Sequence, residues 1–222
     1  MLGEVIPHSG CQALYHLESD GSDSSGNGRD LSTSIYGAFS TGKFGNALDS
    51  NNDDHLDYSD SVGVDLRTKI FGLSFWFKID TQPASGTGYE FVLWMYKSGP
   101  FLTTYKSVRV TYRRPSGEGY KIQLQVTVWP TGTAADFTAV LGRWYKCDVT
   151  ADGTKAYLYI NGTKYIETTP GVFGGYSSEG IELFGDDSEA VQGMMDEVAF
   201  LDYHRTEQDI VRQYAFEMGL LL

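Results

Sequence analysis

The chain has 222 residues, 41% of them hydrophobic and 14% aromatic, and it carries a formal net charge of −12. Its length suits one all-β domain, and its apolar content is enough for a substantial core. The acidic charge argues against nucleic acid as a partner, because binding to phosphates needs a basic face. No apolar run reaches the roughly 18 residues of a membrane-spanning helix, so no membrane insertion is expected. The first residues lack the charged and apolar regions of a secretory signal peptide.

The first half of the chain reads as a series of strands. Runs rich in apolar residues and bounded by turn residues predict strands at residues 12–18, 31–39, 47–58, 71–80 and 89–96. A loop rich in Asp, Ser and Gly, residues 19–29, follows the first of them. Residues 89–96 are almost wholly apolar, which is typical of a strand that is covered on both faces.

The second half predicts hairpins and, at its end, a helix. The hairpin strands are expected at residues 105–113 with 120–129 and at 143–150 with 155–160, followed by single strands at 180–184 and 194–200. Thr206 is the expected N-cap of a short helix, with Ile210, Val211 and Tyr214 on its apolar side. We find no internal repeat and no linker. The prediction is therefore one domain over residues 1–222, an all-β, two-sheet antiparallel jelly-roll β-sandwich with a short C-terminal helix.

One strand of the first hairpin has a distinctly polar face. Side chains alternate across a strand, so Gln123, Gln125, Thr127 and Trp129 share the face opposite an apolar row. Arg109, Thr111 and Arg113 are its expected neighbours on the preceding strand. Sugars are held by aromatic rings and oriented by amide and guanidinium groups. This face therefore predicts a glycan site formed by Arg109, Gln123, Gln125 and Trp129, with Tyr112 as a further ring. The alternative for Tyr112 and Trp129 is a place in the core or in a cross-strand pair.

Several segments also carry a family resemblance. They are Asp-Ser-Ser-Gly-Asn-Gly at 23–28, Lys-Phe-Gly-Asn-Ala-Leu at 43–48, Leu-Ser-Phe-Trp-Phe-Lys at 73–78, Gly-Arg-Trp-Tyr at 142–145 and Met-Asp-Glu-Val at 195–198. The chain resembles laminin-G-like domains of the concanavalin A-like jelly-roll superfamily over nearly its whole length. The resemblance implies structural roles for Trp76 and Trp144. It leaves function open, since this fold carries binding modules, structural domains and enzymes.

The resemblance also implies a structural calcium ion. In the resembled family the first and last strands lie together, which would bring the loop after the first strand close to Asp196. The implied ligands are Asp23, Asn27 and Asp196, and Asp20 is a further candidate in the loop. Calcium takes about six to eight oxygen ligands, which carboxylates, amides and free carbonyls can supply. The alternative is that Asp23 and Asn27 close turns by bonding to their own backbone.

Catalysis is not expected. Glycoside hydrolysis needs two carboxylates across the sugar, and we find no pair of acids two or four residues apart on one uninterrupted strand. The favoured function is a non-catalytic, calcium-stabilised recognition or adhesion module for a glycan or cell-surface polysaccharide, on an extracellular or phage virion surface. The alternative is a structural virion or filament subunit. It would assemble as a homo-oligomer, or with other virion proteins, through its sheet faces and its apolar C-terminal residues 214–222.

The two cysteines, Cys11 and Cys147, are too few for a disulfide framework. Both lie in alternating runs, which favours two buried thiols that act as small hydrophobic side chains. A single bridge between an early strand and a late one is the alternative.

Overall fold

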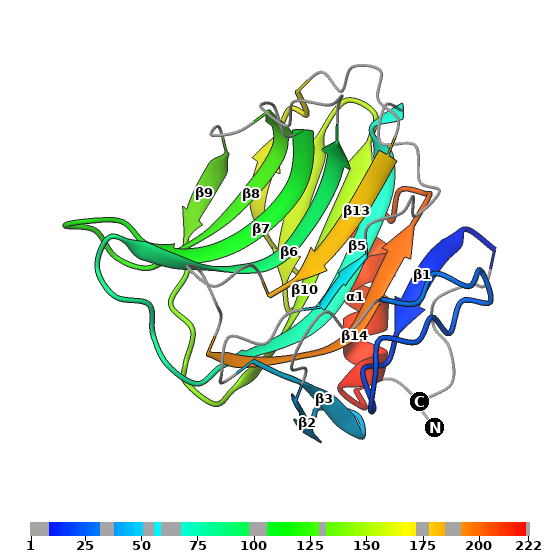
Figure 1. Cartoon of the computed structure of the whole chain (residues 1–222). Helices are drawn as coiled ribbons and strands as arrows, with labels where there is room; N and C mark the ends of the chain where they lie inside the picture. Colours follow the sequence, from blue (N-terminus) through cyan, green and yellow to red (C-terminus); the bar gives the residue numbers. More distant parts are fainter. Residues whose placement is uncertain are drawn as a thin grey trace.

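The computed structural model describes residues 9–31, 38–50, 56–58, 68–97, 106–128, 132–171, 178–184 and 192–220. Two antiparallel sheets are layered over each other, and one helix lies against one of them (Figure 1). This arrangement confirms the predicted all-β sandwich with a short C-terminal helix. No helix within the described ranges is both long and apolar enough to cross a membrane.

The larger sheet, sheet A, has eight strands. These are β1 (Cys11–Tyr15), β2 (Ala38–Thr41), β3 (Asn46–Asp49), β5 (Ile70–Ile79), β10 (Trp144–Asp152), β11 (Ala156–Ile160), β12 (Thr163–Thr168) and β14 (Gly193–Leu201). Their order is β12-β11-β10-β5-β14-β3-β2, and β1 also pairs with β14. The first and last strands therefore lie side by side, as expected.

The smaller sheet, sheet B, has six strands. These are β4 (Leu56–Tyr58), β6 (Thr87–Lys97), β7 (Lys106–Arg114), β8 (Lys121–Val128), β9 (Thr133–Asp136) and β13 (Ser178–Leu183), in the order β4-β13-β6-β7-β8-β9. Helix α1 (Glu207–Glu217) follows the last strand of sheet A. It begins with a capping box, in which Thr206 accepts from the backbone of Asp209 and the Asp209 side chain accepts from the backbone of Thr206. The predicted N-cap at Thr206 is confirmed.

The core fills the space between the inner faces of the two sheets. Phe75 and Phe77 on β5 point inward from sheet A and are fully buried, as is Phe91 on β6 of sheet B. The rings of Phe77 and Phe91 lie 4.5 Å apart between centroids. Cys147 belongs to this core, and Cys11 is buried in a small cluster beside it. Both are free thiols, so the alternative of a bridge is wrong.

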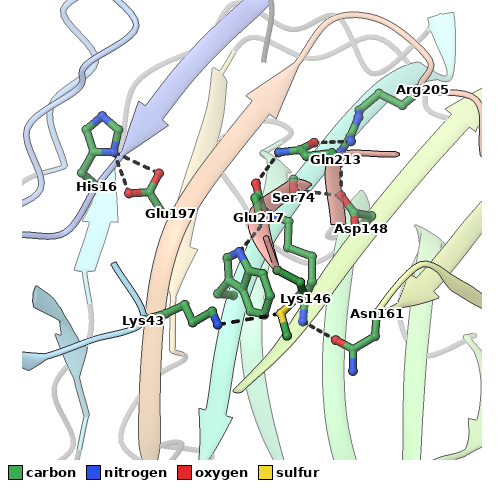
Figure 2. A network of polar contacts seen from close by, with 12 residues as sticks. His16, Lys43, Ser74, Lys146, Asp148, Asn161, Glu197, Arg205, Gln213 and Glu217 are labelled. Atoms are coloured by element: carbon green, nitrogen blue, oxygen red, sulfur yellow. Dashed lines mark hydrogen bonds and ion pairs between the residues drawn. The ribbon is translucent and has the colours of Figure 1, made fainter. Parts of the chain in front are cut away.

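The outer face of sheet A is unusual because it carries charged groups that are buried. Asp148 Oδ1 on β10 lies 2.6 Å from Arg205 Nη1 and accepts a 2.8 Å hydrogen bond from Ser74 Oγ on β5 (Figure 2). Arg205 also donates to Gln213 on α1. Each of these side chains is at most 5% exposed. The ion pair therefore joins the sheet to the residues that start and form the helix.

A second group of contacts fixes the end of the helix. Glu217 of α1 accepts a 2.8 Å hydrogen bond from Trp76 Nε1, and its carboxylate lies 3.2 Å from Lys146 Nζ. The Lys146 ammonium also lies 5.5 Å from the centre of a Trp76 ring. Trp76 is 1% exposed, so its predicted structural role fits. Trp76 fills the space between sheet A and α1 rather than the space between the two sheets. Trp144, the other tryptophan with an expected structural role, is only half-buried.

Three strand predictions need correction. Residues 47–58 were expected to form one strand, but they contribute β3 to sheet A and β4 to sheet B. Strands β9 and β12 were not predicted. Their sequences, Thr-Ala-Ala-Asp and Thr-Lys-Tyr-Ile-Glu-Thr, show little apolar alternation because both strands lie at sheet edges and are largely exposed. Of the predicted strand at 31–39, residues 32–37 lie outside the described residues. The single-domain assignment over residues 1–222 stays a prediction.

We expect Asp148→Ala to lower the free energy of unfolding by about 3–5 kcal/mol, because it leaves the Arg205 guanidinium buried without its carboxylate. Urea denaturation at neutral pH measures this. The control is Glu167→Ala, which removes an exposed partner of Lys164 and should cost less than about 1 kcal/mol. Similar small losses in both variants would contradict the role assigned to the buried pair.

Candidate functional site

The loop after β1 is closed by the side chain of Asp23. Asp23 Oδ1 accepts from the backbone N–H of Leu14 at 3.0 Å and of Ser25 at 2.8 Å. Its Oδ2 accepts from Ser25 Oγ at 2.9 Å and from the backbone N–H of Arg29 at 3.0 Å. Partial burial acts to raise the pKa of Asp23, but the hydrogen bonds outweigh it and the pKa lies below its ordinary value. Both carboxylate oxygens are therefore engaged within the loop.

The other two loop candidates also make local contacts. Asn27 Nδ2 donates to the carbonyl oxygens of Cys11 at 3.0 Å and Gln12 at 3.1 Å. Asp20 is exposed and accepts a hydrogen bond from the backbone N–H of Ser22. These contacts correspond to the turn-forming alternative for Asp23 and Asn27.

Asp196 lies apart from this loop, on the outer face of sheet A. Along one edge of β14, Met194 and Met195 pair with β3, whereas Val198 to Leu201 pair with β1. Asp196 sits where one partner ends and the other begins. Its Oδ2 accepts from the backbone N–H groups of Lys43 and Phe44, each at 2.9 Å. Asp196 therefore caps the turn between β2 and β3.

The second oxygen of Asp196 has an unusual environment. Asp196 is 0% exposed, and its buried Oδ1 has no hydrogen-bond partner among the residues that the structure describes. Burial is the main reason that the pKa of this carboxyl is raised to about 7, with the nearby charge of Glu197 adding to it. A buried carboxylate oxygen without a partner is costly, unless the carboxyl is protonated or a cation lies against it.

Two more acids lie close to this turn. Glu18 Oε2 accepts a 2.8 Å hydrogen bond from the backbone N–H of Asn46, on the far side of the same turn. Glu197, the residue at a bulge in β14, has a positive φ of 53° and contacts His16 Nδ1 at 2.9 Å (Figure 2). The hydrogen bond to Glu197 is the main reason that the pKa of His16 is raised.

The four predicted calcium ligands are not brought together. Asp196 caps the β2–β3 turn, whereas Asp20, Asp23 and Asn27 make their contacts within the loop and with β1. Within the described ranges, no group of three or more His, Cys, Asp or Glu side chains could hold a metal ion. Among the described side chains, Asp196 has the one buried carboxylate oxygen without a hydrogen-bond partner, and a calcium ion there would need further oxygen ligands. The calcium ion itself stays a prediction.

A different surface carries the predicted glycan residues. On β7 the side chains of Val108, Val110 and Tyr112 are buried in the core, so the residues that alternate with them face away from it. The register pairs Arg109 with Gln125, Thr111 with Gln123 and Glu90 with Thr111. We call this surface the polar face of sheet B; it comprises the side chains of Glu90, Arg109, Thr111, Arg113, Lys121, Gln123 and Gln125. The predicted grouping of Arg109, Gln123 and Gln125 on one face is confirmed.

The polar face has a buried floor and a more exposed edge. Glu90 and Gln125 are each 3% exposed and Thr111 is 8% exposed. Arg109 forms an ion pair with Glu90 across neighbouring strands. Gln123 is half-buried, and its Oε1 accepts a 3.1 Å hydrogen bond from Nη1 of the exposed Arg113. Donors and acceptors are therefore held in fixed positions, and Arg113, Gln123 and Lys121 are more accessible than the 13% exposed side chain of Arg109.

The two predicted aromatic ligands have different outcomes. Tyr112 is 0% exposed, its hydroxyl donates to Gln82 Oε1 at 2.7 Å and its ring stacks on that of Tyr120. Its ring therefore belongs to the core, and the prediction that it contacts a ligand is wrong. The reason is that successive side chains of a strand point to opposite faces, so Tyr112 lies on the face opposite Arg109. Trp129 lies outside the described residues.

Sequence reasoning missed Glu90, which supplies the charge that balances Arg109. The signal was present, because Glu90 is the one charged residue in the apolar run 89–96. A carboxylate in such a run is rarely buried unless it is paired. Residues Glu18 and His16 were missed as well, since nothing in their local sequence points to the β2–β3 turn or to Glu197.

The fold and this site can now be compared with known proteins. A laminin-G family model, described as the concanavalin A-like lectin/glucanases superfamily, matches residues 49–211. The chain belongs to this superfamily. No curated protein sequence matches the chain.

Among solved structures, domain 4 of AbnA, an extracellular arabinanase of family GH43 from Geobacillus stearothermophilus, was determined in complex with arabinotriose. It superposes with a TM-score of 0.67 at 18% identity, over 91% of this chain and 97% of that domain. The binding domain of Paraclostridial Mosquitocidal Protein 1 gives a TM-score of 0.68 at 14% identity, over 93% of this chain and 52% of that one. The botulinum neurotoxin serotype D binding domain gives 0.63 at 14% identity, over 93% and 51%. The chain thus spans about half of the toxin domains. At these identities the likeness extends to the fold alone.

We expect Asp23→Ala to lower the free energy of unfolding by about 2 kcal/mol or more. The substitution leaves the N–H groups of Leu14, Ser25 and Arg29 without their acceptor. Asp20→Ala, which removes one exposed hydrogen bond in the same loop, is the matched control and should change stability little. Urea denaturation in chelator measures both, and an unchanged midpoint for Asp23→Ala would refute its role in closing the loop.

Proposed function

We propose that this chain is a non-catalytic recognition module that binds a glycan on the polar face of sheet B. The observation that carries the proposal is the arrangement of Arg109, Gln123 and Gln125 on one face, each held by a neighbouring strand. The described helix, α1, packs on sheet A and not on this face. At the edge of the face Arg113 is exposed and Gln123 is half-buried, whereas Glu90, Thr111 and Gln125 are buried. The superfamily includes lectins, and one similar domain was determined with a bound arabinotriose.

The chemistry of the face suits sugar hydroxyls. A hydroxyl both donates and accepts, so it pairs well with amide groups, which do the same, and with guanidinium donors. Gln123 supplies an amide and Arg113 a guanidinium group at the accessible edge of the face, and the nearly buried Arg109 lies behind them. Their hydrogen bonds to protein neighbours fix their positions before binding, which lowers the entropy lost when a ligand is bound.

The biological setting remains part of the proposal. The similar toxin domains are described as receptor-binding or binding domains, which supports recognition of a surface rather than chemical conversion. We propose a role in adhesion on an extracellular or phage virion surface, where a glycan-binding module without its own catalysis would bring a larger particle or protein to a polysaccharide.

A structural role in assembly is the second candidate. Near the end of the described chain, Val211 is 44% exposed, Met218 is 42% exposed and Leu220 is 72% exposed. Apolar side chains of this size on one helix and its extension favour contact with another protein surface. In this role the chain would be a virion or filament subunit that assembles as a homo-oligomer or with other virion proteins.

We also propose that a structural calcium ion stabilises the module through Asp196. The support is the buried Asp196 Oδ1, which lacks a hydrogen-bond partner. When bound, calcium would supply a positive charge that neutralises this carboxylate. The proposal does not depend on Asp20, Asp23 and Asn27, whose hydrogen bonds hold the loop after β1.

The glycan proposal predicts that Gln123→Ala weakens binding at least about tenfold, because the substitution removes an amide that orients sugar hydroxyls. A glycan array identifies the ligand, with arabinotriose as the first probe, and isothermal titration calorimetry then gives the dissociation constants. The matched control is Gln192→Ala, an exposed glutamine at the start of β14 in the other sheet. If both variants lose the same amount of glycan affinity, the binding site does not lie on the polar face of sheet B. No binding by wild type to any array member, together with a concentration-dependent mass in light scattering, would favour the assembly role.

The calcium proposal predicts that the melting temperature of wild type rises with calcium and falls with chelator. When calcium exceeds its dissociation constant a hundredfold, the free energy of unfolding should increase by about 2.7 kcal/mol. Asp196→Asn should lose this response, while its amide oxygen still accepts from Lys43 and Phe44. Asp20→Asn should keep the response. If calcium does not change the melting temperature of wild type, the calcium proposal is wrong.

A further inference from the structure

The polar face of sheet B contains three cationic side chains, and their charges are balanced to different degrees. Arg109 on β7 forms an ion pair with Glu90 on β6. Lys121 on β8 lies 2.8 Å from Asp136 Oδ1 and 3.2 Å from Glu118 Oε2. Among the described side chains of this face, Arg109 and Lys121 therefore already have carboxylate partners within the protein.

The Glu90–Arg109 pair has the largest effect on a ligand because it is nearly buried. The side chain of Glu90 is 4% exposed and that of Arg109 is 13% exposed. Charges that are shielded from water interact strongly, and salt screens them little. A ligand carboxylate that approached Arg109 would also meet the negative charge of Glu90 and would have to give up its own water. Nothing in the pair offsets these two costs.

The hydroxyl groups of a neutral sugar carry no charge, so Glu90 does not repel them. The remaining residues of the floor and its edge, Thr111, Gln123 and Gln125, have no net charge, and the half-buried Gln123 carries both donors and an acceptor at the edge. The third cation, Arg113, donates to the amide oxygen of Gln123 at 3.1 Å and is exposed. An exposed guanidinium is well solvated, so its attraction for an anion is weak and falls with salt.

We infer that the polar face of sheet B selects neutral glycans and discriminates against uronates, sialylated sugars and other acidic glycans. The inference rests on the proposed function, since it names the class of glycan that the same face would bind. Glu90 is then a specificity-determining residue, because it cancels the charge that would otherwise attract an acid.

The test compares sugars that differ only in charge. The probes are oligogalacturonate and its carboxyl-reduced form, and sialyllactose and lactose, printed on one array with neutral arabino-, gluco- and galacto-oligosaccharides. Calorimetry follows for each pair that gives a signal. We expect neutral members to bind at least about tenfold more tightly than their acidic counterparts, at both low and physiological salt.

Two variants locate the cause. Glu90→Gln keeps the size of the side chain and removes its charge, so the ratio of acidic to neutral dissociation constants should narrow at least about fivefold. Lys164→Ala, which removes an exposed cation on β12 of sheet A, should leave the wild-type preference for neutral sugars in place. The wild-type comparison needs no substitution, so it decides the inference even if Glu90→Gln fails to fold.

The outcomes separate the two proposals. An acidic member that binds as tightly as its neutral counterpart, or more tightly, overturns the selectivity and leaves glycan recognition standing. An unchanged ratio in a folded Glu90→Gln variant overturns the role of Glu90. No binding to any array member overturns the inference and the proposed function together.

Discussion

The buried ion pair between Asp148 and Arg205 determines where helix α1 lies on this domain. It fixes the residues before α1 to the outer face of sheet A, and Gln213 and Glu217 extend the same contacts along the helix (Figure 2). Because such a pair is costly to break, the helix is held against this sheet. On the outer face of sheet A, α1 therefore lies over β5 and β10, opposite the core. The described helix makes no such contact with the polar face of sheet B, whose accessible part is the edge with Gln123 and Arg113.

Strand β14 connects the two ends of the chain to this framework. It pairs with β5 along one edge and shares its other edge between β3 and β1. At the point where those two partners meet, the ladder is interrupted by a bulge, and a side chain replaces the missing backbone acceptor. Asp196 has this role, with one oxygen on the turn of β2 and β3 and the other without a partner. A carboxylate in this place explains both the order of the turn and the affinity for a cation that we propose.

The sequence was most informative where one face of a strand is apolar. Alternation predicted the two hairpins and separated Gln123 and Gln125 from their apolar neighbours, and Thr206 marked the helix start. It was least informative at the exposed edge strands β9 and β12, which have no apolar row. The site was only partly predictable. Tyr112 has the residue type of a sugar platform but the wrong face, and Glu90 became visible only when register placed it beside Thr111 and Arg109.

On both sheets a buried charge is balanced by an opposite charge, but the balancing partner comes from a different part of the structure in each case. On sheet A, buried charges are balanced by partners from the helix, and the balance fixes a covering element in place. On sheet B, Glu90 balances Arg109 from the neighbouring strand of the same sheet, so no further element is needed to neutralise it. With the charge of Arg109 compensated inside the sheet, the half-buried Gln123 at the edge of this face can offer hydrogen bonds without a buried unpaired charge behind it. A surface of this kind discriminates by the arrangement of its donors and acceptors, and hydroxyl-rich neutral sugars are the ligands that such an arrangement can tell apart.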